Sequence, residues 1–479
     1  MVNGVIHTPF FKKRQQYKRQ QLEQLHIDEY NMDSDKIFDR EEQRLLFEVS
    51  SNQTFWFDQQ QDHFDQTNNI TWKQQYQVID DWFDPSQPNA PVFIFLAGEA
   101  PMGFFNFQEV QIRAWAQEFK ALYVILEHRF YGQSYPTNDL STHNLKYLTS
   151  QQALADAANF LTTFKSERGI ADNQAVVFGC SYSGALSAWF RLKYPQLVVG
   201  SVAPSGPVLA QLNYTGYYAQ FTNSAPTSCV NAAQQASDQV MQLIKQGDKG
   251  IKQLEKTFNS CSSLKNGRDL YYFVYSIVEA LGGADQMNNP PTWTLNSTCN
   301  TLSQNSDLLV NWAEIFNQGL DDKCNDFTLR SFIDQARKTR INDQDGTRSW
   351  VFQTCAEFGY FSTTYPGSSV FPGLLNVEEQ VKWCQEIYDV PGMTPNIDWT
   401  NSYYGGQEIK GSNIMFSNGL LDPWHLLSVN QDNIDGTVKA VTYEAGHCGT
   451  LIASTTIDPP SLVDARQGII GFLKEILSA

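Results

Sequence analysis

The feature that most constrains the fold of this chain is a set of near-continuous apolar runs separated by a segment with helical periodicity. The runs VFIFL, LYVIL and AVVF occupy residues 92–96, 122–126 and 175–178, and apolar side chains recur at helical spacing over residues 150–165. Strands that are buried on both faces have such uninterrupted apolar sequences. Their alternation with helices predicts a parallel α/β sheet.

This rhythm stops in the middle of the chain and then returns. A further strand is expected over 197–205, the following stretch is polar and amphipathic with six cysteines, and strands at 413–419 and 438–447 and a helix at 465–477 come after it. We therefore predict a sheet that is split in sequence and continuous in space, with a helical cap inserted. The expected division is an N-terminal extension (1–47), a first part of the core (48–206), the cap (207–400) and a second part of the core (401–479).

The strongest local signal for chemistry is VVFGCSYSG at residues 176–184, where an apolar strand enters a tight turn that a helix follows. A nucleophile elbow has this setting, with an exposed serine at a helix N-terminus. Gly179 precedes Ser181 by two positions, but Ser183 stands where a second glycine is usual. Ser183 is a rival nucleophile, but it lacks a glycine two positions before it. Cys180 as the nucleophile would need a small residue at position 178, which is a phenylalanine. The alternative is a Gly/Ser-rich turn without catalysis.

A serine nucleophile needs a base, and the base needs an acid that orients it. In α/β hydrolases the acid and then the histidine follow the serine along the chain, and only His425 and His447 lie after Ser181. His447 and Asp422 each follow a predicted strand. We therefore predict the triad Ser181, Asp422 and His447 on an α/β-hydrolase fold. The alternative for Asp422 is a turn residue before Pro423, and the alternative for His447 is a loop or buried histidine without a catalytic role.

The same pattern suggests the groups around the triad. The backbone N–H of Tyr182 is the first candidate for the oxyanion hole, and a second donor is expected from GEAPMG at residues 98–103. The segment EHRFYGQS at 127–134 has two interpretations. Either Glu127 and Arg129 form a buried structural pair, which we favour, or the segment shapes a substrate pocket.

Charge and composition exclude several classes of protein. The formal net charge of −17 disfavours binding to a phosphate backbone, so no nucleic-acid partner is expected. No run of 18 apolar residues is present, so we expect no membrane span. We see no CxxC pair or other cluster of metal ligands, and a triad needs no metal or organic cofactor.

Cysteines and sequons favour the secretory pathway. The chain has eight cysteines and four Asn-x-Ser/Thr sequons, at Asn52, Asn69, Asn213 and Asn296. No apolar segment of signal-peptide type is visible within residues 1–47. We nevertheless expect a lysosomal, vacuolar or extracellular location.

These motifs also resemble a known family of serine peptidases. The chain is similar to the prolylcarboxypeptidase and dipeptidyl peptidase II family, which includes the thymus-specific serine protease, and GCSYSG is closest to the thymus-type branch. The resemblance covers roughly residues 55–475, and its landmarks are QQQDHFD (59–65), FLAGEAP (95–101), EHRFYGQSYP (127–136), FGCSYSGALSAWFR (178–191), FQTCAEFGYF (352–361), NGLLDPW (418–424) and AGHC (445–448).

The resemblance implies an α/β-hydrolase domain with an inserted helical domain and the same triad. It implies an exopeptidase that acts on short peptides near proline, either removing a C-terminal residue or releasing N-terminal dipeptides, and it suggests a homodimer. It also implies a Cys355–Cys384 disulfide. Our hypothesis for the remaining cysteines pairs Cys229 with Cys299 and Cys261 with Cys324, and leaves Cys180 and Cys448 as free thiols.

Two other functions stay open at this point. An esterase or lipase could use the same triad, because a fold alone does not define the substrate. An inactive homologue could serve as a binding protein, and the features that favour it are the altered position at Ser183 and the lack of a visible signal peptide.

Overall fold

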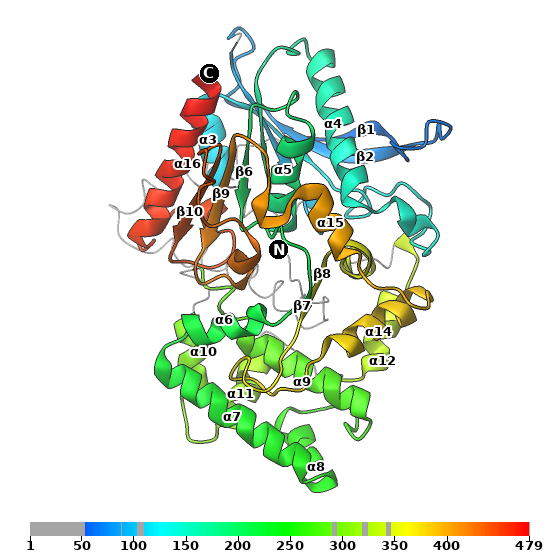
Figure 1. Ribbon diagram of the computed structural model, residues 1–479, viewed down its shortest axis with the longest axis vertical. Helices are drawn as coiled ribbons and strands as arrows, with labels where there is room; N and C mark the ends of the chain where they lie inside the picture. Colours follow the sequence, from blue (N-terminus) through cyan, green and yellow to red (C-terminus); the bar gives the residue numbers. More distant parts are fainter. Residues whose placement is uncertain are drawn as a thin grey trace.

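The molecule is organised around one eight-stranded sheet (Figure 1). A computed structural model of the chain describes residues 53–87, 89–102, 110–289, 295–318, 324–341 and 346–478. The strands, in sheet order, are β1 (Gln53–Gln60), β2 (Thr71–Ile79), β4 (Leu122–Leu126), β3 (Val92–Leu96), β5 (Ala175–Phe178), β6 (Gly200–Pro204), β9 (Ile414–Gly419) and β10 (Val438–Tyr443).

The pairing confirms a predominantly parallel sheet that is split in sequence. β1, β2 and β4 pair antiparallel, and every other neighbouring pair is parallel. β6 pairs with β9 in a register that sets Ser201 opposite Ile414, so the sheet continues across the insertion. The predicted runs correspond to β3, β4, β5, β6, β9 and β10. With its strand order and connecting helices, this is the predicted α/β-hydrolase fold.

Helices cover both faces of the sheet, and alternate strand residues pack against each layer. Phe93 and Phe95 of β3 pack in one cluster with Trp115 and Phe472, whereas Ile94 packs in the cluster on the other face. Helices α3 (Val110–Phe119) and α16 (Pro460–Ser478) pack on one face, and α4 (Ser150–Glu167) and α5 (Tyr182–Lys193) pack on the other (Figure 1).

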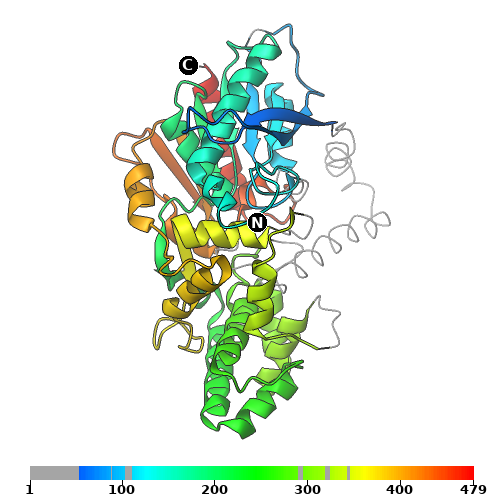
Figure 2. The ribbon, with the colours of Figure 1, turned by 90° about the vertical axis from the view of Figure 1, so that its right-hand side faces the viewer.

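The insertion is helical and lies at one end of the molecule (Figures 1 and 2). A short parallel pair, β7 (Gln211–Tyr214) and β8 (Gly359–Ser362), joins it to the core. Its helices are α6 (Gly216–Ser224), α7 (Thr227–Lys245), α8 (Asp248–Thr257), α9 (Gly267–Gly282), α10 (Leu295–Leu302), α11 (Leu308–Asn317), α12 (Leu329–Ala336), α13 (Thr347–Gln353), the π-helix η6 (Thr354–Phe358) and α14 (Val377–Tyr388).

Three disulfides cross-link this insertion. They join α7 to α10, the segment after α8 to the segment before α12, and η6 to α14. The pairs are Cys229–Cys299, Cys261–Cys324 and Cys355–Cys384, which are the pairs expected above.

The domain division stays a prediction, and its third boundary, at residue 400, falls within a helix that packs on the core. Residue 400 lies inside α15 (Ile397–Tyr404), whose Tyr404 stacks on Trp189 of α5 with ring centroids 4.0 Å apart. The extension 1–47 lies outside the described residues. Among the helices that the structure describes, none is long and apolar enough to cross a membrane.

Candidate active site

Ser181 sits on a strained turn between β5 and α5. Its backbone has φ 66° and ψ −128°, a left-handed conformation that favours glycine. The Ser181 N–H donates to the Pro204 carbonyl oxygen at 3.0 Å, which ties the turn to the end of β6. A serine held in this way at the first turn of a helix has the backbone geometry of a nucleophile elbow.

Small residues are required around the turn. A Cβ added to Gly179 would lie 1.9 Å from the Ser183 carbonyl oxygen, and one added to Gly184 would lie 2.6 Å from the Pro204 carbonyl oxygen. The Ser183 hydroxyl accepts the Cys180 N–H at 2.8 Å and donates to the Cys180 carbonyl at 2.9 Å. The rival serine is therefore engaged in closing the turn, and the departure from the usual motif leaves the elbow intact.

Asp422, His447 and Ser181 form a continuous hydrogen-bonded chain. His447 Nε2 lies 2.6 Å from Ser181 Oγ, and His447 Nδ1 lies 2.6 Å from Asp422 Oδ2. Asp422 Oδ1 accepts the N–H of Trp424 at 3.1 Å, which orients the carboxylate. All three side chains are at least 97% buried. The structure thus brings together the three residues that the sequence placed far apart, whereas the His425 ring contacts the Asp422 carbonyl instead.

The expectation that Cys180 and Cys448 are free is wrong. They form a fourth disulfide, with Cα atoms 6.0 Å apart and a sequence separation of 268. The cause is geometric: Cys180 precedes Ser181 and Cys448 follows His447, so the contact between the serine and the histidine also brings their neighbours together. The disulfide therefore joins the two loops that carry the candidate nucleophile and base.

Tyr182 has a second connection besides its backbone. Its N–H is at the first position of α5, where helix geometry offers no intrahelical acceptor, so it stays the predicted oxyanion donor. Its hydroxyl lies 3.1 Å from His128 Nε2 and accepts from Gln353 Nε2 at 2.7 Å. Gln353 Oε1 in turn accepts the Tyr131 hydroxyl at 2.6 Å. This buried chain joins the elbow to α13 of the insertion.

The tautomer of His128 follows from its surroundings. Burial lowers the pKa of His128 to about 4, so the ring is neutral near pH 7. Its Nδ1 lies 2.7 Å from the Arg129 carbonyl oxygen and therefore carries the proton. Nε2 is then the acceptor for the Tyr182 hydroxyl.

Glu127 and Arg129 are buried and structural, but the prediction that they pair with each other is wrong. Glu127 holds its own loop by accepting from Met102 N, Gln133 N and Ser134 Oγ at 2.7 to 3.0 Å. Arg129 instead forms a two-pronged pair with Asp156 of α4, with both N···O distances 2.6 Å. Glu127 was not the partner of Arg129 because the Glu127 side chain bonds to nearby loop groups, whereas the Arg129 side chain reaches helix α4.

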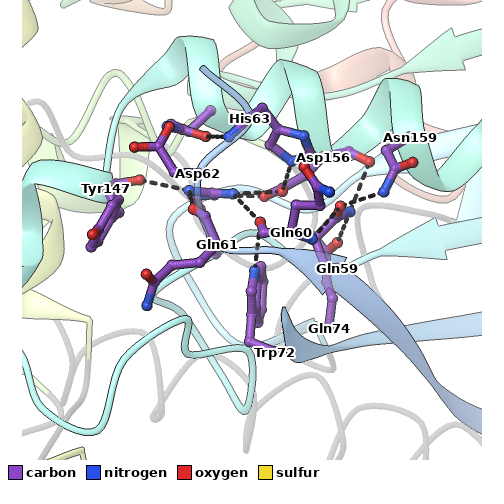
Figure 3. Close-up of polar contacts among 12 residues, drawn as sticks. Gln59, Gln60, Gln61, Asp62, His63, Trp72, Gln74, Tyr147, Asp156 and Asn159 are labelled. Carbon is purple, nitrogen blue, oxygen red and sulfur yellow. Dashed lines mark hydrogen bonds and ion pairs between the residues drawn. The ribbon is translucent and has the colours of Figure 1, made fainter. Parts of the chain in front are cut away.

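The QQQDHFD landmark surrounds this ion pair (Figure 3). Arg129 also donates to the carbonyl oxygens of Gln60, Gln61 and Tyr147, and His63 Nε2 lies 2.8 Å from Asp156 Oδ1. Every guanidinium direction is thus used. The landmark therefore has a structural role, and it anchors the loop that carries His128 beneath the elbow.

The ionisable groups near the triad are mostly acids. Glu99, in the loop after β3, is 2% exposed and close enough to His447 for their charges to interact; burial raises its pKa. Burial also raises the pKa of Asp285 well above its usual range, with a contribution from the Asp422 charge. Behind the elbow, burial raises the pKa of Glu357 to about 7.

The remaining site predictions concern metal ligands, sequons and the second oxyanion donor. Among the described residues, the group with metal-ligand spacing is Cys180, His447 and Cys448, and its two sulfurs are bonded to each other. The sequons at Asn69, Asn213 and Asn296 are exposed, and glycosylation there stays a prediction. Asn52 lies outside the described residues, as does the end of the predicted oxyanion loop beyond residue 102.

Sequence reasoning missed the residues that support the site from elsewhere in the chain. Gln353 lies in the FQTCAEFGYF landmark, which identifies the segment but not the contact with Tyr182. Gln286 and Asn289, which contact the His447 loop, lie in a stretch without motif or periodicity. No local signal could have identified them.

The strand order, the inserted helices and a serine presented on a strained strand-to-helix turn define the class: this is an α/β hydrolase. A family model described as serine carboxypeptidase S28 matches residues 59–469. The chain belongs to this family of serine peptidases.

Curated relatives extend over most of the chain. A putative serine protease, K12H4.7 of Caenorhabditis elegans, is 32% identical over 451 residues, which cover 88% of each chain. The thymus-specific serine protease of Mus musculus is 30% identical over 447 residues, covering 88% of this chain and 87% of that protein. The lysosomal Pro-X carboxypeptidase of Homo sapiens is 29% identical over 442 residues, covering 86% of each.

Proposed function

We propose that this protein is a serine exopeptidase that cleaves short peptides through an acyl-enzyme on Ser181. The observation that carries the proposal is the chain of 2.6 Å contacts from Asp422 through His447 to Ser181 Oγ. Such a chain allows the imidazole to accept the hydroxyl proton while the carboxylate holds its tautomer and stabilises the resulting cation. The fold and the family support hydrolysis, and this geometry supports the proposed mechanism.

The reaction follows from these contacts. His447 Nε2 takes the Ser181 proton as Oγ attacks the peptide carbonyl carbon, and the backbone N–H of Tyr182 stabilises the oxyanion. The same nitrogen then protonates the leaving amine. Water, deprotonated by His447, attacks the acyl-enzyme and releases Ser181.

Burial of the triad supports a preference for chain ends. Ser181 is 1% exposed and His447 3% exposed, and the His447 loop lies against the insertion. A short peptide reaches such a site more readily than a folded chain does. The relative named lysosomal Pro-X carboxypeptidase supports cleavage beside proline. Four disulfides and the same relative support a lysosomal, vacuolar or extracellular location. In such a location the sequons would be glycosylated. The homodimer stays a proposal from resemblance.

The test uses two proline-containing peptides, one blocked at its N-terminus and one at its C-terminus, with products read by mass. Loss of a C-terminal residue from the first means carboxypeptidase action, and release of dipeptides from the second means dipeptidyl peptidase action. Ser181→Ala should lower kcat by at least about 10⁴-fold. If the folded enzyme cleaves neither peptide but hydrolyses acyl esters, the peptidase proposal is wrong and an esterase replaces it.

A further inference from the structure

The loop that carries His447 is fixed to the core on its downstream side. Cys448 is bonded to Cys180, and its N–H donates to Ser205 Oγ at 3.0 Å. These contacts hold the end of the loop next to the elbow. The position of the imidazole therefore depends on what holds the upstream side.

On the upstream side the loop rests on the insertion. The contacting segment, residues 285–289 between α9 and α10, is called the brace segment here. The His447 N–H donates to the Gln286 carbonyl at 2.8 Å, and the Gly446 N–H donates to the Asn288 carbonyl at 2.9 Å. Asn289 Nδ2 donates to the His447 carbonyl at 2.9 Å. Both backbone polar groups of His447 are thus bound by the insertion.

The contact is close enough to require glycine in the loop. A Cβ on Gly446 would lie 2.6 Å from the Gln286 carbonyl oxygen and 2.8 Å from Asn288 N. The brace segment is itself held, because the Tyr217 hydroxyl donates to Gln286 Oε1 at 2.6 Å and Tyr217 is fully buried. Asp285 Oδ1 accepts the N–H of Gln286 at 2.8 Å. The brace segment therefore presents fixed partners to the loop.

We propose that the brace segment is a positioning element for the catalytic base, with Asn289 as its principal side chain. The proposal rests on the function proposed above. Because Ser181 Oγ is 2.6 Å from His447 Nε2, a small backward movement of the loop lengthens the bond that proton transfer needs. The inserted helical domain would then complete the catalytic site as well as cover it.

The decisive variants are Asn289→Ala and Asn289→Asp. The first removes the donor to the His447 carbonyl, and the second is nearly isosteric but sets an acceptor against that carbonyl. The matched control is Asn300→Ala, at an exposed position of α10 in the same domain. The active enzyme is counted by fluorophosphonate titration, so that kcat per active site and KM for a short peptide are measured separately.

We expect Asn289→Ala to lower kcat per active site by about 5- to 10-fold, the equivalent of one lost hydrogen bond, with KM unchanged. Asn289→Asp should lower it further, and Asn300→Ala should leave it unchanged. Gly446→Ala places a Cβ of the His447 loop against the backbone of the brace segment, so it should also lower kcat. Its effect should not add to that of Asn289→Ala, because both act on the same contact.

A merely structural role for Asn289 would reduce the fraction of active enzyme and leave kcat per active site unchanged. That result, in both Asn289 variants, would overturn the positioning proposal while the wild-type enzyme still reacts with the fluorophosphonate. If the wild-type enzyme does not react, the proposed function itself fails. The two failures are therefore distinguishable.

Discussion

Replacement of Asp156 by asparagine should destabilise the fold strongly, because the structure buries its ion pair almost completely. The Arg129 and Asp156 side chains are 0% and 1% exposed. The carboxylate accepts two Arg129 N–H groups at 2.6 Å and faces His63 Nε2 at 2.8 Å. An asparagine has nearly the same shape but no charge, and its amide would set a donor against a donor.

The expected magnitude follows from the charge that is left behind. Removing one partner of a buried pair leaves an uncompensated charge and costs about 3–5 kcal/mol. The matched control is Asp58→Asn, because the Lys73–Asp58 pair has a similar 2.7 Å distance but side chains that are 60% and 66% exposed. Exposed pairs contribute about 0–1 kcal/mol.

The assay is equilibrium unfolding in urea, which does not screen charges. Unfolding is monitored by tryptophan fluorescence, with the disulfides intact. We expect Asp156→Asn to lower the free energy of unfolding by several kcal/mol and Asp58→Asn to leave it almost unchanged. Because Arg129 anchors the loop of His128, kcat should fall as well. Equal, small effects of the two variants on the unfolding midpoint would show that burial of the Arg129–Asp156 pair does not set its contribution to stability.

Three further perturbations test the site. Gly179→Ala adds a Cβ 1.9 Å from a carbonyl oxygen in the first turn of α5, so kcat should fall at least about 100-fold, whereas Gly471→Ala, with open space around it, should have no effect. Glu357 has a pKa of about 7 against an ordinary 4.5, so the folded protein holds its proton more tightly and stability falls as pH rises between these values. The free energy of unfolding should therefore decrease from pH 4.5 to pH 8, and Glu357→Gln should make this decrease about 3 kcal/mol smaller. The double variant Cys180→Ser, Cys448→Ser should lose about 2–4 kcal/mol of stability and show lower kcat per active site, and unchanged values of both would contradict a positioning disulfide.

The parts of the fold that could be predicted from sequence are those in which burial leaves a local pattern. β3, β4 and β5 are buried along their whole length, so their apolar runs are uninterrupted. The hairpin β1–β2 was not predicted, because its strands are rich in glutamine and other polar residues and many of their positions are exposed. Helix α3 was also missed; it has no acidic residue in its first turn and no basic residue in its last turn.

The candidate site divides in the same way. Ser181, Asp422 and His447 each follow a strand, and the order of the three along the chain is enough to select them. Contacts between distant loops leave no such trace. The Cys180–Cys448 bond joins residues 268 positions apart, and the contacts of the brace segment to His447 are made largely by backbone atoms, which any sequence could supply.

The most direct test of the proposed nucleophile is to label the folded protein with a fluorophosphonate and locate the adduct by peptide mass mapping. We expect one adduct, on Ser181, that is lost in Ser181→Ala and retained in Ser183→Ala. We also expect slower labelling in Asp422→Asn, because the imidazole then loses the carboxylate that orients it. An adduct on Ser183, or labelling that persists in Ser181→Ala, would contradict the assignment of the nucleophile.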